Sequence, residues 1–176
     1  MGVEHIYRLL KTKKQKEFVF DFSQNADQYE KWEEVEIGKE FESQRKFEVT
    51  LEDIVAYTKG VTDDNPLMND PKYAGKIVEH PLFCVQVAFW CIETGSCSWI
   101  RTPGAINPGQ KIEIFKPFEV GDMITLKQKA HDKWIKRDKR YLTYGLYYYN
   151  QKNELCAIWW LTLILPKSGI QEKHQI

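Results

Sequence analysis

The spacing of apolar and polar residues first becomes regular at residues 50–60, where it predicts a short helix. Thr50 suits the N-cap position, and Asp53 falls in the first turn, where the helix dipole favours an acidic side chain. Apolar residues recur at helical spacing at Leu51, Ile54 and Val55. Gly60 is suited to end the helix, because glycine readily adopts the left-handed backbone found at many helix C-termini.

A second helix is predicted over residues 82–94, whose sequence is LFCVQVAFWCIET. Pro81 suits its first position because the ring presets the helical φ, and His80 then stands at the N-cap. The segment is apolar nearly all round, so the helix is expected to be buried on every side.

Four strand-like segments rich in Ile, Tyr, Trp and Thr follow a connection at residues 96–109 that contains several Gly and Pro. They cover residues 111–118, 122–134, 141–149 and 155–165. Turn signals separate them at Val120-Gly121-Asp122, at Arg137-Asp138-Lys139 and at residues 150–153. Short turns between successive strands predict an antiparallel meander. Further extended segments are predicted at residues 18–22 and 39–49.

One buried helix followed by a meander predicts an α+β domain over residues 31–166. Residues 1–30 are then an N-terminal extension and residues 167–176 a polar C-terminal tail. The last strand, LCAIWWLTLIL, is apolar on both faces. One face can cover the helix, and the other is expected to need a second partner, such as another subunit.

Composition narrows the class of protein. The 176 residues fit one ordinary domain. The 25 Lys and Arg residues balance 25 Asp and Glu residues, so the net charge gives no indication of a nucleic-acid or membrane-surface partner. No apolar run approaches the roughly 18 residues of a membrane span, and no secretory signal is recognisable. The four cysteines form no C-x-x-C pair, so the spacing of a zinc site is absent. Neither a metal nor a cofactor is expected. The predicted location is the cytoplasm.

The loop at residues 61–73 has the sequence VTDDNPLMNDPKY, which is dense in Asp, Asn and Pro. Within it stand Thr62-Asp63-Asp64-Asn65-Pro66-Leu67-Met68, and Gly75-Lys76-Ile77-Val78-Glu79-His80-Pro81-Leu82-Phe83 follow. Further on stand Phe115-Lys116-Pro117-Phe118-Glu119-Val120-Gly121-Asp122. Together these segments resemble the MaoC-like hydratase and dehydratase family, whose members carry a G-D-x-N-P-L-H loop and a K/R-P-x-x-x-G-D turn.

The resemblance implies a hotdog fold, in which an antiparallel sheet wraps a long central helix. It also implies an acyl thioester substrate, carried by coenzyme A or by acyl carrier protein. Met68 and Pro81 agree best with the non-catalytic or N-terminal half of the family, which resembles the mycobacterial HadA and HadC dehydratase subunits. Members of that half commonly pair with a catalytic half.

The resemblance also implies roles for individual residues. In catalytic members an Asp and a His flank one water molecule, and backbone N–H groups near the start of the helix stabilise the oxyanion. Asp63 occupies the Asp position, where it either holds water or closes an Asx turn. Met68 occupies the His position and cannot transfer a proton. Asn65 either braces the loop or contacts substrate, and His80 either approaches the thioester or caps the helix.

Two other groups of residues have both a structural and a functional interpretation. Cys84 and Cys91 lie on one face of the buried helix and are expected to pack in the core. The basic segment at residues 129–140 is expected to be a solvated hairpin tip, or else to bind coenzyme A phosphates or an acidic carrier. The candidate phosphate ligands are Lys133, Lys136, Arg137 and Arg140.

The leading hypothesis is therefore a subunit of an enoyl-thioester hydratase or 3-hydroxyacyl-thioester dehydratase. In this hypothesis the chain binds the acyl thioester, and a homologous MaoC-type subunit supplies the Asp and His of a hetero-oligomer. A hotdog thioesterase and a non-catalytic acyl-CoA-binding or scaffold protein remain as alternatives, because a fold does not decide function.

Overall fold

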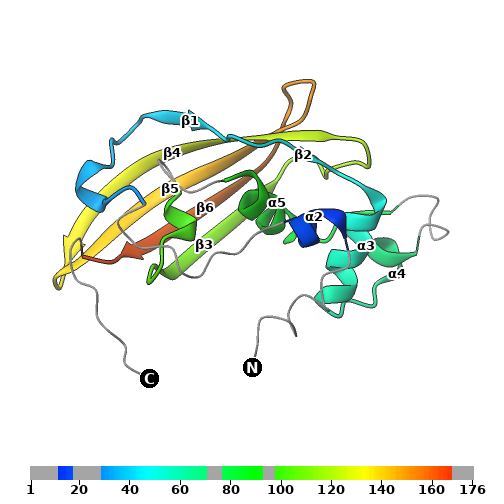
Figure 1. The fold of residues 1–176 in the computed structure, drawn as a ribbon, viewed down its shortest axis with the longest axis horizontal. Coiled ribbons are helices and arrows are strands. Elements are labelled where there is room, and N and C mark those ends of the chain that lie inside the picture. The colour runs from blue at the N-terminus through cyan, green and yellow to red at the C-terminus, as the bar shows by residue number, and fades with distance from the viewer. Residues whose placement is uncertain (1–11, 18–28, 71–76, 93–97, 168–176) are drawn as a thin grey trace.

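An antiparallel sheet of six strands organises the chain (Figure 1). The computed structural model describes residues 12–17, 29–70, 77–92 and 98–167. The strands are β1 (Glu40–Glu42), β2 (Phe47–Glu48), β3 (Ile106–Ile114), β4 (Met123–Lys136), β5 (Lys139–Tyr149) and β6 (Leu155–Leu165). Their order is β1-β4-β5-β6-β3, and β2 also pairs with β4. The predicted meander is confirmed in β4, β5 and β6, which are neighbours in the sheet, but β3 pairs with β6 rather than with β4.

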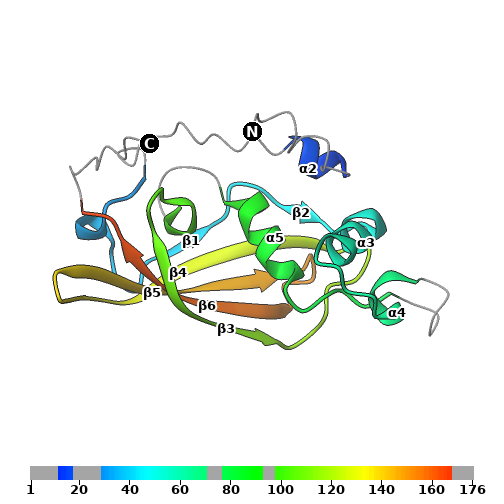
Figure 2. The same cartoon turned by 90° about the horizontal axis from the view of Figure 1, so that it is seen from below.

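The helices are short, and the central one lies against a single face of the sheet. They are α2 (Lys13–Glu17), α3 (Leu51–Gly60), α4 (Pro66–Asn69) and α5 (Phe83–Cys91), with 3-10 turns η2 (Trp32–Glu34) and η3 (Trp99–Arg101). Figure 2 shows α5 and η3 on the same face of the sheet, with α3 and α4 at one end of it. None of the helices in the described part of the chain is long and apolar enough to cross a membrane.

Helix α5 forms the centre of the core. Phe83, Val87, Ala88 and Cys91 are fully buried against the sheet. The expected burial on every side is wrong, because Val85, Phe89 and Trp90 of α5 are only half-buried. The inward-facing residues of β4 and β5 include Ile124, Leu126, Leu142 and Leu146, which are also fully buried. Each such side chain contributes roughly 1.5–3 kcal/mol by leaving water.

The start of α5 differs from the expectation. Pro81 and Leu82 form a turn, and the helix begins at Phe83, whose backbone N–H donates to the carbonyl oxygen of His80 at 2.8 Å. The N-cap residue is Leu82 rather than His80. The prediction that His80 is the N-cap residue is therefore wrong, and the helix begins two residues later than expected. The predicted end of this helix lies partly at residues 93–97, outside the described residues.

Strand β3 also departs from its predicted bounds. It begins at Ile106, inside the segment that was expected to be an irregular connection. Pro108 cannot donate a backbone hydrogen bond, but β3 is an edge strand, where a missing donor is tolerated. The pairing of β3 with β6 shifts register between Ile106 and Gly109, on either side of this proline. The strand predicted at residues 18–22 lies outside the described residues.

Strand β6 is fully covered on its inner face and partly covered on its outer face. Its inward residues pack on the core, and its outward Trp160 lies under the rings of His131 and Tyr147, with ring centroids 4.9 and 5.7 Å away. The indole Nε1 of Trp160 donates to Glu113 Oε2 at 2.7 Å. Part of the apolar outer face of β6 is therefore covered inside the chain, and its cover by a second subunit stays a prediction.

The basic N-terminal segment contributes one buried contact. Lys14 on α2 lies 2.6 Å from Asp53 Oδ2 and sits over the Phe47 ring, with Nζ 4.8 Å from its centroid. Asp53 also closes the capping box with Thr50 at the start of α3. The N-cap prediction is confirmed, and Lys14 joins this cap from the N-terminal extension.

Candidate active site

The loop between α3 and α4 is shaped by its own side chains. Thr62 has a positive φ of 57°, and the Asp63 N–H donates to the carbonyl oxygen of Thr58 at 3.1 Å. Asp63 Oδ1 accepts from the Asn65 N–H at 2.9 Å, and Asn65 Oδ1 accepts from the Leu67 N–H at 3.1 Å. Both Asx turns arise from the sequence D-D-N-P-L, with Pro66 as the first residue of α4. Asn65 thus braces the loop that carries Asp63.

His80 meets Asp63 across this loop. Its Nε2 lies 3.7 Å from Asp63 Oδ2, and the two side chains are 18% and 27% exposed. Its Nδ1 accepts from the Leu82 N–H at 3.0 Å. A neutral imidazole whose Nδ1 accepts carries its proton on Nε2, so an N–H faces the carboxylate. The two side chains therefore lie close together, and both are partly exposed to solvent.

An aromatic ring from α3 completes the surroundings of His80. Tyr57 lies with its ring centroid 5.5 Å from that of His80 and 5.6 Å from that of Phe83. The sequence argument did not single out Tyr57. The signal was its spacing, because three residues after Ile54 a helical side chain returns to the buried face.

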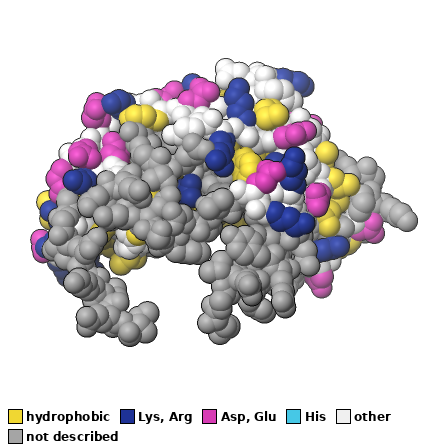
Figure 3. Space-filling view, in the orientation of Figure 1, with side chains coloured by type: hydrophobic (Ala, Val, Ile, Leu, Met, Phe, Trp, Pro, Cys, Tyr) yellow, Lys and Arg dark blue, Asp and Glu magenta, His cyan; other side chains and the backbone are white. Residues whose placement is uncertain are grey.

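Exposed apolar side chains belong to the segments that hold Asp63 and His80. On the face shown in Figure 3, hydrophobic side chains reach the surface at the end of the molecule that carries α3 and α4. Three exposed large apolar residues belong to the segments that hold Asp63 and His80, namely Val61, Leu67 and Leu82. The Val78 N–H donates to the carbonyl oxygen of Leu67 at 2.8 Å, which ties the two segments together.

A buried acid holds the His80 segment against the sheet. Glu79 is 6% exposed, and its Oε1 accepts from the Phe118 N–H at 2.8 Å. Burial raises the pKa of Glu79 to about 8, with a smaller contribution from Asp122, although the bond from Phe118 opposes the shift. Glu79 is therefore mainly protonated at neutral pH. Sequence reasoning missed this residue, which no motif marks.

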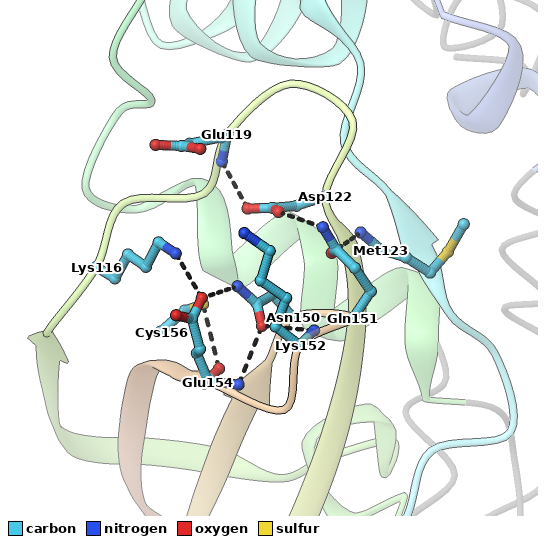
Figure 4. A network of polar contacts seen from close by, with 9 residues as sticks. All are labelled: Lys116, Glu119, Asp122, Met123, Asn150, Gln151, Lys152, Glu154 and Cys156. Atoms are coloured by element: carbon cyan, nitrogen blue, oxygen red, sulfur yellow. Dashed lines mark hydrogen bonds and ion pairs between the residues drawn. The ribbon is translucent and has the colours of Figure 1, made fainter.

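The loop that presents Phe118 is held by the polar network shown in Figure 4. Asp122 Oδ2 accepts from the Glu119 N–H at 2.9 Å, and Asp122 Oδ1 accepts from Gln151 Nε2 at 3.1 Å. Gln151 Oε1 in turn accepts from the Met123 N–H at 2.9 Å. Gly121 has a φ of +95°, which a residue with a side chain rarely adopts. The turn predicted between β3 and β4 is confirmed.

Solved structures of other proteins share the fold of this chain. No protein-family model and no curated protein sequence matches the chain. Among solved structures, R-hydratase PhaJ1 from Pseudomonas aeruginosa is 19% identical with a TM-score of 0.62, covering 77% of this chain and 85% of that one. The MaoC-like dehydratase from Rhodospirillum rubrum is 17% identical with a TM-score of 0.63, covering 77% and 96%. The HadBC 3R-hydroxyacyl-ACP dehydratase complex from Mycobacterium tuberculosis is 16% identical with a TM-score of 0.61, covering 73% and 96%.

The chain has the MaoC-like hotdog fold. The α+β prediction is therefore confirmed. At this level of sequence identity the comparison establishes the fold alone. The particular similarity to the HadA and HadC half of the family stays a prediction.

Within this hotdog chain, His80 approaches Asp63 and Met68 occupies the loop position at which a His was expected. Met68 lies on α4, where its N–H donates to the carbonyl oxygen of Asn65 at 2.9 Å. A thioether is at best a weak acceptor and carries no exchangeable proton. The imidazole that lies near Asp63 thus comes from the segment before α5, seventeen residues after Asp63.

Two of the four candidate phosphate ligands, Lys133 and Arg140, bind the segment around η2. Lys133 Nζ donates to the carbonyl oxygens of Trp32, Glu33 and Val35 at 3.2, 3.2 and 2.8 Å. Arg140 Nε donates to Glu33 Oε1 at 2.7 Å. Lys133 and Arg140 therefore secure η2.

Lys136 and Arg137 are exposed at the turn between β4 and β5. Figures 1 and 2 place this turn at the opposite end of the sheet from α3 and α4. Within the described residues of one chain, Lys136 and Arg137 do not meet Asp63 and His80. Phosphate binding by these residues stays a prediction.

The cysteines of α5 belong to the hotdog core. Cys84 and Cys91 are buried, and burial raises the pKa of each thiol to about 12. Both are protonated thiols at neutral pH and therefore poor nucleophiles. The packing interpretation is confirmed.

Proposed function

We propose that this chain adds water to a 2-enoyl thioester, or removes it from the 3-hydroxyacyl thioester, with Asp63 and His80 at the reacting atoms. The observation that carries the proposal is the 3.7 Å approach of His80 Nε2 to Asp63 Oδ2. The fold shared with R-hydratase PhaJ1 and with MaoC-like and HadBC dehydratases supports it. The apolar residues around the pair suit an acyl chain attached to coenzyme A or to acyl carrier protein.

The tautomer of His80 determines which of the two side chains acts as the hydrogen-bond donor and which as the base. Because Nδ1 accepts from the Leu82 N–H, His80 offers its Nε2–H as a donor that orients the water oxygen and the Asp63 carboxylate. Asp63 takes a proton from this water as the oxygen bonds to C3 of the substrate. The electron pair of the C2–C3 double bond moves toward the thioester carbonyl and forms an enolate. Asp63 then returns the proton to C2, so that one water molecule is added.

Asn65 serves as a positioning residue in this scheme. Its backbone N–H bonds Asp63 Oδ1, which leaves Oδ2 directed at His80. A positioned acid–base group contributes roughly 10²–10⁴-fold to a rate.

The test uses the purified chain with crotonyl-CoA and longer 2-enoyl-CoA esters. The wild type is expected to turn over at roughly 1–10³ s⁻¹. Asp63→Asn and His80→Gln should each lower kcat/KM at least about 10²-fold. The matched control is Asp64→Asn, which removes the neighbouring carboxylate and should leave the rate within about threefold. A wild type without turnover, or variants that match it, would overturn the proposal.

A second candidate function is favoured by Met68. In this version the chain binds the acyl thioester, and a homologous MaoC-type subunit supplies both Asp and His within a hetero-oligomer. HadBC, one of the structures with this fold, is a complex. Co-expression with a homologous chain that carries an intact D-x-N-P-L-H loop tests it. Activity confined to the pair, which survives Asp63→Asn here and is lost when the partner's His is replaced, would support this function over the first.

A further inference from the structure

Water addition to an enoyl thioester needs a hydrogen-bond donor for the carbonyl oxygen, which becomes negative in the enolate. The start of a helix beside the reacting atoms can offer backbone N–H groups for this purpose. In this chain three of the N–H groups before and within α5 are already engaged. Leu82 N–H donates to His80 Nδ1 at 3.0 Å, Phe83 N–H to the His80 carbonyl at 2.8 Å, and Val85 N–H to the Leu82 carbonyl at 3.0 Å. Pro81 has no N–H.

Tyr57 offers a donor at the same place. Its ring packs between those of His80 and Phe83, at centroid distances of 5.5 and 5.6 Å, so it stands over the turn that begins α5. The residue is half-buried, and its hydroxyl makes no hydrogen bond to any other residue in the described part of the chain. A phenol that is neither fully buried nor already bonded can meet a bound ligand.

The electrostatic setting keeps this phenol in its donor form. Burial, and to a smaller extent the nearby Cys84 thiol, raise the pKa of Tyr57 above its ordinary value. Its proton is therefore retained throughout the neutral pH range. The thiol and the ring contacts also show that Tyr57 faces the first turn of α5, where the carbonyl of a thioester beside His80 would lie.

We propose that the Tyr57 hydroxyl donates a hydrogen bond to the thioester carbonyl oxygen and stabilises the enolate. This inference rests on the proposed hydration and dehydration activity and adds a third catalytic residue to Asp63 and His80. No proton passes from Tyr57. As the C2–C3 electron pair moves onto the carbonyl oxygen, the O–H···O bond strengthens, and it weakens again when Asp63 protonates C2. Removing one such donor from an enzyme typically lowers kcat about 10²–10³-fold.

Tyr57→Phe tests the proposal, because it removes only the hydroxyl and keeps both ring contacts. The expected result is a fall in kcat of about 10²–10³-fold for crotonyl-CoA hydration, with KM within about threefold. The matched control is Tyr141→Phe, in which the altered ring stacks on Trp134 at 5.0 Å near the distant β4–β5 turn. The control should retain the wild-type rate.

A binding measurement separates an oxyanion donor from a packing residue. Acetoacetyl-CoA ionises to an enolate, which ultraviolet absorption detects, whereas butyryl-CoA stays a neutral thioester. Tyr57→Phe should weaken binding of the acetoacetyl-CoA enolate at least tenfold and leave butyryl-CoA affinity unchanged. A kcat within threefold of the wild type, or equal losses for both ligands, would overturn the role of Tyr57. A wild type that neither hydrates crotonyl-CoA nor binds either ester would instead overturn the proposed function itself.

Discussion

Glu79 makes the stability of this protein depend on pH in a direction that is unusual for an acid. Its side chain is 6% exposed, accepts one hydrogen bond from the Phe118 N–H, and has its second carboxyl oxygen buried without a partner in the described structure. Burial raises its pKa from 4.5 to about 8. The change to test is Glu79→Gln, which keeps the size and the acceptor oxygen of the side chain but cannot ionise.

The sign follows from proton binding in the two states. Below about pH 4.5 Glu79 is protonated in both the folded and the unfolded chain, so pH has no effect through this group. Between pH 4.5 and 8 Glu79 is ionised in the unfolded chain, whereas in the folded chain it keeps its proton. The proton bound only by the folded state lowers the free energy of unfolding as pH rises, by about 1.4 kcal/mol per pH unit.

The interval from 4.5 to 8 corresponds to about 5 kcal/mol in total, of which about 3 kcal/mol is reached at pH 7. Above pH 8 both states are ionised and the loss is constant. These magnitudes are a large share of the roughly 5–15 kcal/mol stability of an ordinary domain. The effect should therefore be measurable.

The assay is urea unfolding of the wild type and Glu79→Gln at several pH values between 5 and 9, with the free energy of unfolding extrapolated to water. The difference, variant minus wild type, should rise by about 1.4 kcal/mol per pH unit up to pH 8 and then level off. Glu119→Gln is the matched control, because Glu119 is an exposed carboxyl in the same loop. A difference that does not change with pH would refute the assignment of a buried, protonated Glu79.

Two further predictions concern the sheet. Replacing Lys136 and Arg137 together with Ala should leave coenzyme A ester affinity within about twofold at low salt, because their turn lies at the opposite end of the sheet from Asp63; a tenfold loss that shrinks at high salt would show that they bind phosphate. Gly145→Ala should lower the free energy of unfolding by about 1–3 kcal/mol, because the added Cβ would stand 2.9 Å from the Tyr147 ring. Urea unfolding measures this loss against Gly109→Ala, where nothing lies within 4 Å of the new Cβ, and equal stabilities would contradict it.

The sequence by itself determined the features that depend on neighbours in the chain. The capping box of Thr50 and Asp53 begins α3 as expected, since it joins residues three apart. The turn at Arg137 and Asp138 was also predictable, and both residues adopt the positive φ that a two-residue hairpin turn needs. The Asx turns around Asp63 arise in the same way. Segments rich in Ile, Tyr, Trp and Thr between turn signals placed the strands, and the apolar run after Pro81 placed the buried helix.

Only the tertiary structure decided which distant residues meet. His80 reaches Asp63 because the turn before α5 and the loop before α4 dock at one end of the sheet. Glu79 is buried because the Phe118 loop closes over it, and Lys133 is engaged because η2 lies against β4. Each of these contacts joins segments that are far apart in the sequence, and no regular spacing in the sequence indicates that they meet. A pattern of period two or 3.6 states which face a side chain occupies, but the partner on that face is chosen by how the whole core packs.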